Sequence, residues 1–452
     1  MYSEAVEKEL KKKGISVGDR VKIKNSDDAE GVGSLEGMLM PKSVGADDTL
    51  ILKLDSGYNV GIIFDKKIKK LKEEKLTTTK KVKAEKHKKV EGLPTISIMT
   101  TGGTIASRID YRTGGTYPAE TADEIAEMVP EAVKNANLRL IPVFQIFSED
   151  MEPYHWVKLA ERIKEEIDEI QPDGIIVTHG TDTMHYTAAA LSFMLQNLPV
   201  PVLLVGSQRS SDRGSSDAHV NLACAINFIA NTDFSGVSIC MHGSMSDDYC
   251  LIHDGTHVRK MHSSRRDTFK SINVLPYAKV HYNGTVEMLR SDYRKKDKKR
   301  KINLVARFEK NIALVKTYPG FDYRIIENLV SSGIKGILLE GTGFGNFPVN
   351  NVDEYTDHHK KLLDFFSEAS KKVLLVMTSQ TINGNPDLDV YSTGRIEQKA
   401  GIIPVRMTPE TAFVKLGWAL GHSKDLKTAK EIMLKDSVGE ITERIDPRAF
   451  SF

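Results

Sequence analysis

The chain has 452 residues, of which 40% are hydrophobic and 27% charged, and its formal net charge is +2. This length exceeds one ordinary domain, and the composition excludes a wholly disordered or fibrous chain. The nearly balanced charge neither requires nor excludes a nucleic-acid partner. No run approaches the roughly 18 apolar residues of a membrane span, and residues 1–13 lack the apolar core of a signal peptide. We therefore expect a cytoplasmic protein that does not contact membranes.

The N-terminal region predicts a small β domain and a spacer. Between Val17 and Phe64, short apolar alternations are separated by Gly, Asp and Ser clusters, as in successive short strands. We expect a small all-β barrel domain in residues 1–75. The lysine-dense run from Lys66 to Val90 offers almost nothing to a core and predicts a basic linker in residues 76–93. A plain spacer is favoured over an RNA-binding segment, because blocks of like charge are usually extended and solvated.

From Pro94 onward, apolar strands alternate with helical periods, which predicts parallel sheets covered on both faces. The expected elements are strands in 95–100, 174–180 and 201–207 and helices in 122–129, 156–170 and 221–230. We expect an N-terminal α/β catalytic domain in residues 94–300. After a polar stretch, Arg290 to Lys301, the rhythm resumes and predicts a smaller C-terminal α/β domain in residues 301–452. Ligands of such sheets bind at the carboxyl ends of the strands.

Two motifs lie at expected strand ends. The first is Thr100-Thr101-Gly102-Gly103-Thr104, in which paired glycines allow a sharp turn that presents a hydroxyl. A plain strand-to-loop turn explains this motif equally well when it is taken alone. The second is Thr178-His179-Gly180-Thr181-Asp182, which repeats the order of glycine and threonine and adds a carboxylate. Asp182 by itself is also an ordinary residue for the start of a helix.

Together the two motifs resemble the signature motifs of the bacterial-type L-asparaginase family. The resemblance implies an asparaginase-like two-domain α/β core with parallel sheets, and it implies catalytic roles for five residues. Thr104 takes the place of the first catalytic threonine, and Tyr117 that of its activating tyrosine. Thr181 and Asp182 match the second threonine and its neighbouring aspartate, while Lys260 matches the lysine that completes the second triad.

The same resemblance implies a substrate-binding set. Ser148 and Glu149 match the pair that binds the amino-acid head of the substrate, and Asp182 joins Glu149 as an acceptor for its α-ammonium group. The segment from Gly206 to Arg209, with residues 216–222, looks like the family's scaffold around the third strand. We expect this segment to support the site rather than to react.

One departure from the family concerns the first triad. Family members complete it with a glutamate lent by a neighbouring subunit. No position between Asp387 and Pro409 aligns well with that glutamate, and Glu397 is a weak candidate. Activation of Thr104 is therefore the less certain half of the predicted chemistry.

The chemistry explains why these residue types are needed. An amide is a poor electrophile and a neutral hydroxyl a weak nucleophile, so the hydroxyl needs a nearby base and the oxyanion needs donors. Lys260 can act as that base only when it is neutral, which requires burial or cationic neighbours such as Arg259. Taken without the motifs, Lys260 would be interpreted as a surface lysine.

Metal and disulfide chemistry are not expected. Cys224, Cys240 and Cys250 lack C-x-x-C spacing, which predicts buried reduced thiols. The histidines of the catalytic region form neither H-E-x-x-H nor a cysteine-histidine array, so we predict no metal site. They are His179, His185, His242, His253, His257 and His262.

A barrel and a basic linker are absent from ordinary asparaginases. Their combination with this core resembles the D-type subunits of the archaeal glutamyl-tRNA(Gln) amidotransferase family. That resemblance implies an amidohydrolase that releases ammonia from glutamine or asparagine, for ATP-dependent conversion of Glu-tRNA(Gln) to Gln-tRNA(Gln). It implies no cofactor in this chain, with ATP and Mg on an E-type partner, a tRNA-binding kinase/transamidase. It also implies a homodimer within a heterotetramer, with the tRNA bound mainly through the partner.

Two other functions stay open at this stage. One is a free-standing cytoplasmic L-asparaginase or glutaminase. The other is an RNA-binding protein with an inactive hydrolase core, for which the barrel and lysine run would be responsible. The presence of all five matching catalytic positions argues against the second, and an ammonia-release assay with and without misacylated tRNA and the partner separates all three.

Overall fold

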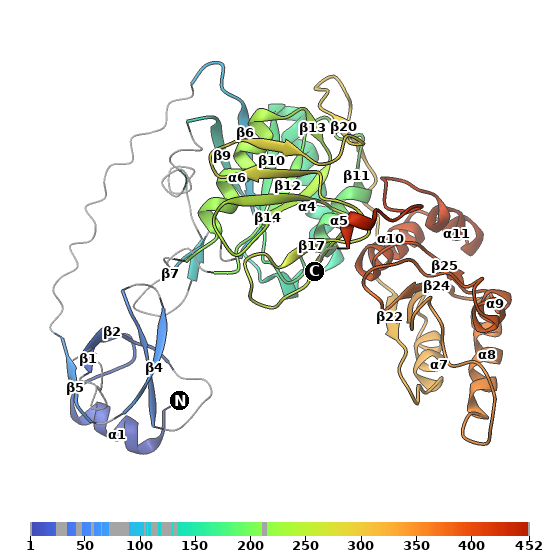
Figure 1. Ribbon diagram of the computed structural model, residues 1–452, viewed down its shortest axis with the longest axis horizontal. Helices are drawn as coiled ribbons and strands as arrows, with labels where there is room; N and C mark the ends of the chain where they lie inside the picture. The colour runs from blue at the N-terminus through green and yellow to red at the C-terminus, as the bar shows by residue number, and fades with distance from the viewer. Residues whose placement is uncertain are drawn as a thin grey trace.

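The structure is a computed structural model of the whole chain (Figure 1). It describes residues 2–23, 34–41, 48–55, 58–64, 66–71, 90–103, 105, 107–109, 116–118, 129, 134–209 and 215–450. Three parts follow one another along the chain: a small N-terminal domain, a large α/β domain and a smaller C-terminal α/β domain (Figure 1). Most of the expected linker and the helix expected in 122–129, apart from Val129, lie outside the described residues.

The N-terminal domain is an antiparallel sheet preceded by a helix. The sheet has the order β4-β3-β2-β1-β5. Its elements are α1 (Glu4–Lys12), β1 (Arg20–Ile23), β2 (Leu35–Leu39), β3 (Thr49–Lys53), β4 (Asn59–Ile63) and β5 (Ile68–Lys70). The helix was not part of the sequence prediction. It begins at Ser3, whose hydroxyl accepts from the Val6 amide, and it buries Val6 and Leu10 against the strands.

The large α/β domain is built on an eight-stranded sheet of order β19-β18-β15-β14-β12-β10-β6-β9. The strands from β14 to β9 run parallel, as predicted, and the other three are antiparallel. The parallel strands are β6 (Thr95–Thr100), β9 (Asn137–Pro142), β10 (Gly174–Thr178), β12 (Val202–Val205) and β14 (Val237–His242). The antiparallel strands are β15 (Tyr249–Asp254), β18 (Ala278–His281) and β19 (Val286–Met288).

Helices cover both faces of this sheet. Along β10, Ile175 and Val177 pack in the cluster that contains α4 and α5, whereas Ile176 packs in the cluster that contains α6. All five residues of β10 are therefore buried, which is why its sequence is continuously apolar. The helices are α4 (Pro153–Ile170), α5 (Met184–Met194) and α6 (Ala218–Asn231). The three cysteines are free and buried, as predicted.

Short elements decorate the edges of the large domain. They are the 3-10 turn η1 (Ser148–Asp150) and four strand pairs: β7 (Ser107–Ile109) with β8 (Thr116–Pro118), β11 (Leu195–Gln196) with β21 (Asn303–Leu304), β13 (Phe234–Ser235) with β20 (Arg294–Lys295), and β16 (Val258–Lys260) with β17 (Phe269–Ser271). The pair β16–β17 and the pair β13–β20 lie at opposite ends of the domain in Figure 1. The two pairs therefore belong to different surfaces of the molecule.

The C-terminal domain has a four-stranded parallel sheet of order β22-β23-β24-β25. Its strands are β22 (Ile312–Lys316), β23 (Gly336–Gly341), β24 (Leu374–Ser379) and β25 (Ile403–Pro404). Its helices are α7 (Arg324–Ser331), α8 (His358–Ala369), α9 (Ser392–Lys399), α10 (Pro409–Gly421), α11 (Leu426–Leu434) and the 3-10 turn η2 (Pro447–Ala449). The predicted asparaginase-like arrangement of two α/β domains is therefore present.

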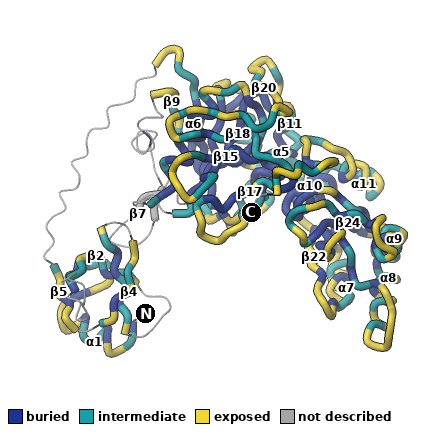
Figure 2. Tube along the Cα trace, viewed as in Figure 1, coloured by how far each residue is buried: buried dark blue, intermediate teal, exposed yellow. Residues whose placement is uncertain are grey.

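Helix α10 joins the two α/β domains. Its Val414 and Trp418 belong to the core of the large domain, and the Trp418 ring stacks on Phe193 of α5 with centroids 5.4 Å apart. Its Ala412 and Leu416 belong to the core of the C-terminal domain. Figure 2 shows this junction as a continuous buried region. Among the described residues, no helix combines the length and apolar character required to cross a membrane.

Candidate active site

A cavity of about 600 Å³ opens at the carboxyl ends of β6, β10 and β12. Segments from several elements form its wall, because the strand-to-loop turns of neighbouring parallel strands meet at this edge. Its lining residues are Gly102, Gly103, Gln145, Ile146, Phe147, Ser148, Glu149, Asp150, Gly180, Thr181, Asp182, Ser207, Gln208, Lys260 and Ser263. Five of the residues predicted for the site are among them, whereas Thr104 and Tyr117 are not.

Two glycines let the strand ends approach one another. Gly103 has φ +82°, and a side-chain carbon there would lie 2.7 Å from the Gly180 amide nitrogen. At Gly180, a side-chain carbon would lie 2.8 Å from the Cβ and Oγ of Ser148. Both distances are too short for any other residue without movement of the backbone. The glycines of the two motifs therefore bring the turn after β6, the turn after β10 and η1 into contact.

Thr181, Asp182 and Lys260 form a hydrogen-bonded cluster at the cavity. The Lys260 Nζ donates to Thr181 Oγ1 at 2.8 Å and to Asp182 Oδ1 at 2.7 Å. Thr181 is buried, and the Lys260 side chain is 10% exposed, whereas the Asp182 side chain is 65% exposed. A hydroxyl that lies within hydrogen-bond reach of a lysine amine is the arrangement needed for activation by proton transfer.

Arg259, the neighbour of Lys260 on β16, is paired away from the cavity. Its Nε lies 3.3 Å from Oε1 of Glu410, at the start of α10. The positive charge expected to favour a neutral Lys260 is therefore partly offset by a carboxylate. Burial raises the pKa of Glu410, an effect that the Arg259 charge opposes. Burial, and then the charges of Arg259 and Lys260, lower the pKa of the adjacent His185 to about 3.

The predicted substrate-binding residues line the same cavity. Ser148 is buried in η1, and its carbonyl oxygen accepts from the Thr183 hydroxyl at 2.6 Å. The Ser148 Oγ lies 3.5 Å from Oε2 of Glu149, which places a hydroxyl and a carboxylate side by side. Glu149 and Asp182 thus supply two carboxylates to one cavity. Such a pair suits a ligand that carries an ammonium group.

The segment after β12 is held in place by a buried carboxylate. Asp217, which is fully buried, accepts from the backbone amides of Gln208 and Arg209 at 3.0 Å and from the Asn221 side chain at 3.1 Å. Asn221 in turn donates to the Gly206 carbonyl at 2.9 Å. These bonds fix the loop that carries Ser207 and Gln208 into the cavity, which fits the supporting role predicted for the segment.

The structure describes only part of the first predicted triad. Thr104 lies outside the described residues, and Tyr117 belongs to β8, of which only the backbone is described. Glu397 does not fit the role of a lent glutamate. Its side chain is fully buried within the C-terminal domain, where Oε1 accepts from the Phe347 amide at 2.7 Å. A residue in this position reaches no neighbouring subunit, so that candidate was wrong.

Sequence reasoning missed Glu410, Gln208 and Ser263. Glu410 follows Pro409 at the start of a helix, where an acidic residue is ordinary, and its contact with Arg259 joins distant parts of the chain. Gln208 was assigned to the scaffold, although its side-chain nitrogen is buried at the cavity without a hydrogen-bond partner among the described residues. The available signal for Ser263 was its place three residues after Lys260, in the loop between β16 and β17.

The six histidines of the catalytic region have separate environments. His179, for example, lies between the Gly180 carbonyl and the Thr187 hydroxyl, and burial lowers its pKa to about 4. His242 contacts Asn221 and Asp247, and His253 contacts Ser271. Nowhere in the described parts of the chain do three or more His, Cys, Asp or Glu side chains gather closely enough to hold a metal ion.

Comparisons with known proteins assign the class first. Family models for the N-terminal asparaginase domain and for the glutaminase/asparaginase C-terminal domain match residues 95–294 and 311–433. The solved L-asparaginase from Thermococcus kodakarensis is 32% identical, with a TM-score of 0.67 over 77% of this chain and 99% of that one. L-asparaginase I from Vibrio cholerae is 27% identical, with a TM-score of 0.64 over 77% and 99% of the two chains. Fold and sequence thus define an asparaginase-like protein.

The N-terminal domain and the full-length relatives give the particular family. A model for the GatD N-terminal domain matches residues 15–71. The D-type subunit of the glutamyl-tRNA(Gln) amidotransferase of Pyrococcus furiosus is 48% identical over 98% of this chain and 99% of its own length. Its counterpart from Sulfolobus acidocaldarius is 44% identical over 96% and 93%. The chain belongs to this family of D-type glutamyl-tRNA(Gln) amidotransferase subunits, as the combination of its N-terminal region with the asparaginase-like core predicted.

Proposed function

We propose that this chain hydrolyses the side-chain amide of glutamine and supplies the ammonia to a partner subunit, which converts Glu-tRNA(Gln) to Gln-tRNA(Gln). The observation that carries the proposal is the contact of Lys260 with Thr181 and Asp182 at a cavity of the large domain. The family membership supplies the acceptor, since the full-length relatives are named for glutamyl-tRNA(Gln) amidotransferase.

The reaction needs two displacements at one carbonyl carbon. A threonine hydroxyl attacks the amide carbon, its proton passes to a base, and the C–N bond breaks as the leaving nitrogen takes up a proton to become ammonia. Water then attacks the resulting ester, releases glutamate and restores the hydroxyl. Thr181 is the hydroxyl that lies beside a lysine, and neutral Lys260 is the base for it. Thr104, with Tyr117, is proposed as the other catalytic threonine.

Substrate binding is assigned to the acidic rim of the same cavity. Glu149 and Asp182 accept from the α-ammonium group, and the Ser148 hydroxyl contacts the amino-acid head. Asparagine is shorter than glutamine by one methylene, and one methylene in a pocket is worth only about 1–3 kcal/mol. We therefore assign glutamine from the family and test it against asparagine.

The experiment is a kinetic measurement of ammonia release from glutamine and from asparagine. It compares the chain alone, with the partner subunit, and with the partner, ATP, Mg²⁺ and misacylated tRNA. We expect slow release by the isolated chain and acceleration in the full mixture, because a partner that binds the active arrangement more tightly shifts the population toward it. Fast release that is indifferent to tRNA and partner would identify a free-standing asparaginase or glutaminase. No release under any condition would leave an inactive core.

The N-terminal domain is proposed to dock the partner, with the linker in residues 76–93 providing reach. ATP, Mg²⁺ and recognition of tRNA bases belong to that partner, within a heterotetramer built on a homodimer of this chain. Deletion of residues 1–90 tests the docking. We expect basal ammonia release to survive and partner binding or stimulation to fall. Unchanged binding and stimulation would assign the contact to the two α/β domains instead.

A further inference from the structure

Basic residues are concentrated in one short segment of the large domain. Between Arg290 and Lys301 the chain has eight Lys and Arg against two Asp, a net charge of +6, whereas the whole chain has +2. This stretch separates the two α/β domains in sequence, and the proposed amide chemistry does not use it. We call the part from Arg294 to Lys301 the cationic ridge.

The ridge is fixed to the body of the domain. Its first two residues form β20, which pairs with β13. The Asp297 amide donates to the Pro199 carbonyl at 3.0 Å. The Arg300 guanidinium donates to the carbonyls of Leu198 at 2.7 Å and Lys295 at 3.1 Å. The segment is therefore held along the turn before β12.

Part of the charge on the ridge is already paired. The Nζ of Lys295 lies 2.9 Å from Asp233, and the Nζ of Lys298 lies 2.6 Å from Asp173. Three exposed side chains have no carboxylate partner within the described parts of the chain: Arg294, Lys299 and Lys301. Arg294 reaches only the Asn197 amide oxygen, at 3.4 Å. These three cations are available to an external anion.

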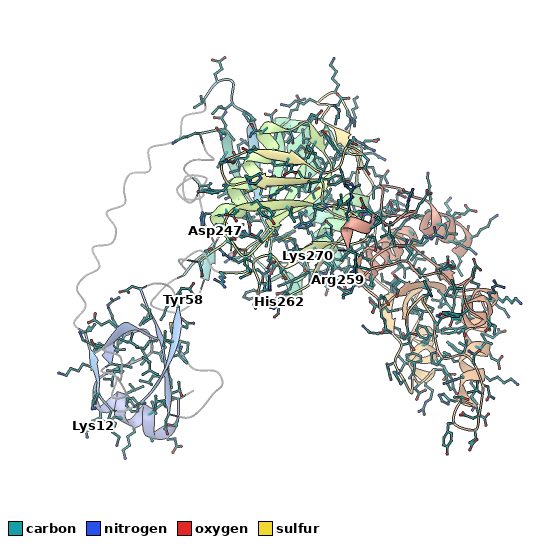
Figure 3. The ribbon with its side chains drawn as sticks, viewed as in Figure 1. Lys12, Tyr58, Asp247, Arg259, His262 and Lys270 are labelled. Atoms are coloured by element: carbon teal, nitrogen blue, oxygen red, sulfur yellow. The ribbon has the colours of Figure 1, made fainter. Side chains whose placement is uncertain are left out.

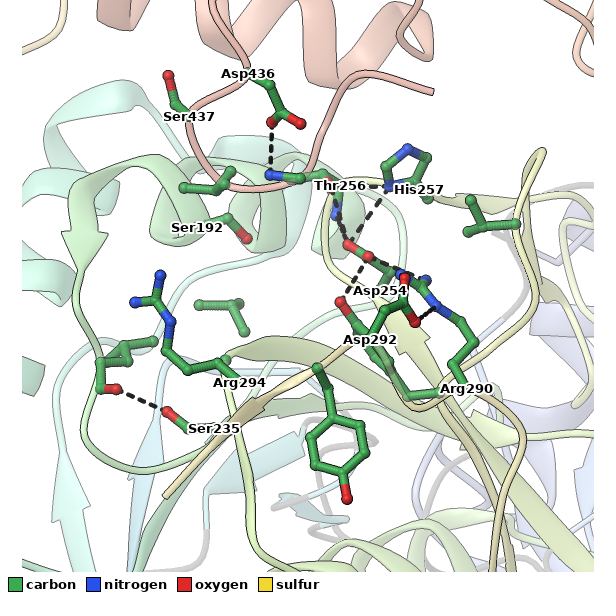
Figure 4. Close-up of a pocket in the computed structure, with 18 of the residues that line it drawn as sticks. Ser192, Ser235, Asp254, Thr256, His257, Arg290, Asp292, Arg294, Asp436 and Ser437 are labelled. Carbon is green, nitrogen blue, oxygen red and sulfur yellow. Dashed lines mark hydrogen bonds and ion pairs between the residues drawn. The ribbon is translucent and has the colours of Figure 1, made fainter. Parts of the chain in front are cut away.

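The ridge runs between two hollows in the surface. Arg294 lies in the wall of a hollow of about 790 Å³, whose lining also contains Arg290, Arg444 and the carboxylates of Asp254, Asp292, Asp436 and Glu443. In Figure 4 the Arg294 guanidinium extends away from the cluster of Arg290 with its aspartate partners. On the other side, Lys299 and Lys301 line a hollow of about 440 Å³. Consecutive residues of the turn before β12 line the two hollows, residues 195–198 the first and Pro199 and Val200 the second.

The composition of this surface fits a nucleic-acid backbone better than a protein. None of the large hydrophobic side chains between Arg290 and Lys301 is exposed. Protein interfaces have apolar and aromatic centres from which lysine is depleted, whereas nucleic-acid interfaces are polar, wet and strongly cationic. Spaced Lys and Arg side chains on a rigid support neutralise phosphates without reading bases. We infer that Arg294, Lys299 and Lys301 bind the phosphate backbone of an RNA, the tRNA of the proposed function.

The position of the ridge determines which part of the RNA it can contact. The ridge is attached near the N-terminal ends of β10 and β12, where Asp173 and Pro199 lie, whereas the cavity opens at their carboxyl ends. Figure 1 accordingly shows β20 and β17 at opposite ends of the domain, and Figure 3 labels Lys270 of β17 together with Arg259 at that far end. The ridge thus holds the body of the RNA, remote from the amide chemistry. Removal of its charges changes RNA affinity and leaves basal ammonia release intact.

The test measures binding of a labelled glutamine-specific tRNA transcript to the full chain, by fluorescence anisotropy across a range of salt concentrations. The ridge variant is Arg294→Ala/Lys299→Ala/Lys301→Ala. The matched control, Lys360→Ala/Lys361→Ala/Lys372→Ala, removes the same charge from positions around α8 of the C-terminal domain. We expect the ridge variant to bind about tenfold more weakly and the slope of log Kd against log salt to fall by about 2–3, as for the loss of three phosphate contacts. The control should bind within about twofold of the parent chain, because its lysines lie outside the ridge.

Two results would overturn the inference. Equal tRNA affinities and salt slopes for the ridge and control variants would show that the ridge does not contact RNA. Unchanged tRNA affinity with weakened binding of the partner subunit would make the ridge a protein surface. The tRNA identity rests on the proposed function, so ammonia release from glutamine is measured on the same preparations. Absence of ammonia release in the parent chain would contradict the proposed function. The difference in tRNA affinity between the ridge and control variants would still decide whether the ridge binds RNA.

Discussion

Lys260 and Lys415 both contact a carboxylate, and their surroundings differ. Lys260 lies at the cavity, with Asp182 largely exposed and the Thr181 hydroxyl as a second acceptor. Lys415 of α10 is fully buried with its partner Glu440, and it also donates to the carbonyls of Met433 and Lys435. Burial lowers the pKa of Lys415 and raises that of Glu440, and their mutual attraction opposes both shifts.

The difference separates the lysine that is proposed to react from a structural one. All the acceptors around Lys415 belong to the fold, and Glu440 in turn receives the amides of Ser437 and Val438, so the pair fixes the loop after α11. Lys260 has a hydroxyl and an exposed carboxylate as partners, and a ligand can reach all three groups. A buried ion pair therefore indicates a structural role, whereas a partly open pair beside a hydroxyl indicates chemistry.

The largest effect should follow removal of the hydroxyl beside Lys260. We expect Thr181→Ala to lower kcat for ammonia release by about 10³-fold or more, because nucleophile and base act as a unit. Thr104→Ala should do the same, and the losses should not add. Steady-state kinetics and thermal unfolding check this, with the exposed Thr285→Ala as control. Near-normal turnover in Thr181→Ala would remove that residue from the mechanism. The contact of Lys260 with Thr181 would then give no reason to treat Lys260 differently from Lys415.

The second effect tests whether Lys260 transfers a proton or only supplies charge. Arginine stays protonated at any useful pH, so Lys260→Arg should lower kcat by about 10²-fold or more. The control is Lys270→Arg on neighbouring β17, where Lys270 is exposed beside Asp267. Substantial activity in Lys260→Arg would mean that the positive charge itself is what the reaction needs.

The third effect concerns the structural pair. Lys415→Met leaves Glu440 buried without its cation, and we expect the free energy of unfolding to fall by about 3–5 kcal/mol. The double variant Lys415→Met/Glu440→Gln should recover much of this loss, and kcat per folded molecule should be unchanged in both. Urea unfolding measures the free energy of unfolding. Steady-state kinetics, divided by the concentration of folded protein, measure kcat per folded molecule. A large fall in kcat without loss of stability would contradict the division between the two lysines.

Local sequence patterns predicted the strands and turns of the fold, but they did not predict contacts between residues that are far apart in the sequence. The apolar run of β10 and the turn glycines Gly103 and Gly180 are local signals, because burial on two faces and close backbone approach dictate residue type directly. The contact between Thr181 and Lys260 joins positions 79 residues apart, which no periodicity reveals, and only the family resemblance pointed to it. The Arg259–Glu410 pair had neither signal, because it forms only when α10 docks between the domains.

The smallest effect concerns Glu397, a buried acid that, unlike Glu440, has no lysine partner among the described residues. Glu397 is fully buried, its Oε2 has no hydrogen-bond partner in the described parts of the chain, and burial raises its pKa from about 4.5 to about 8. The folded chain therefore binds this proton more tightly than the unfolded chain does. As pH rises from about 4.5 to about 8, this group should lower the free energy of unfolding by about 1.4 kcal/mol per pH unit.

Glu397→Gln should remove this contribution, since the amide can still accept from the Phe347 amide and carries no charge at any pH. Urea unfolding at pH 5, 6, 7 and 8 gives the difference between variant and parent, in which the titration of other groups cancels. We expect the variant to gain stability relative to the parent as pH rises, with ammonia release unchanged per folded molecule. A constant difference would mean that Glu397 is ionised in the fold, and that a buried carboxylate here needs no lysine partner of the kind Glu440 has.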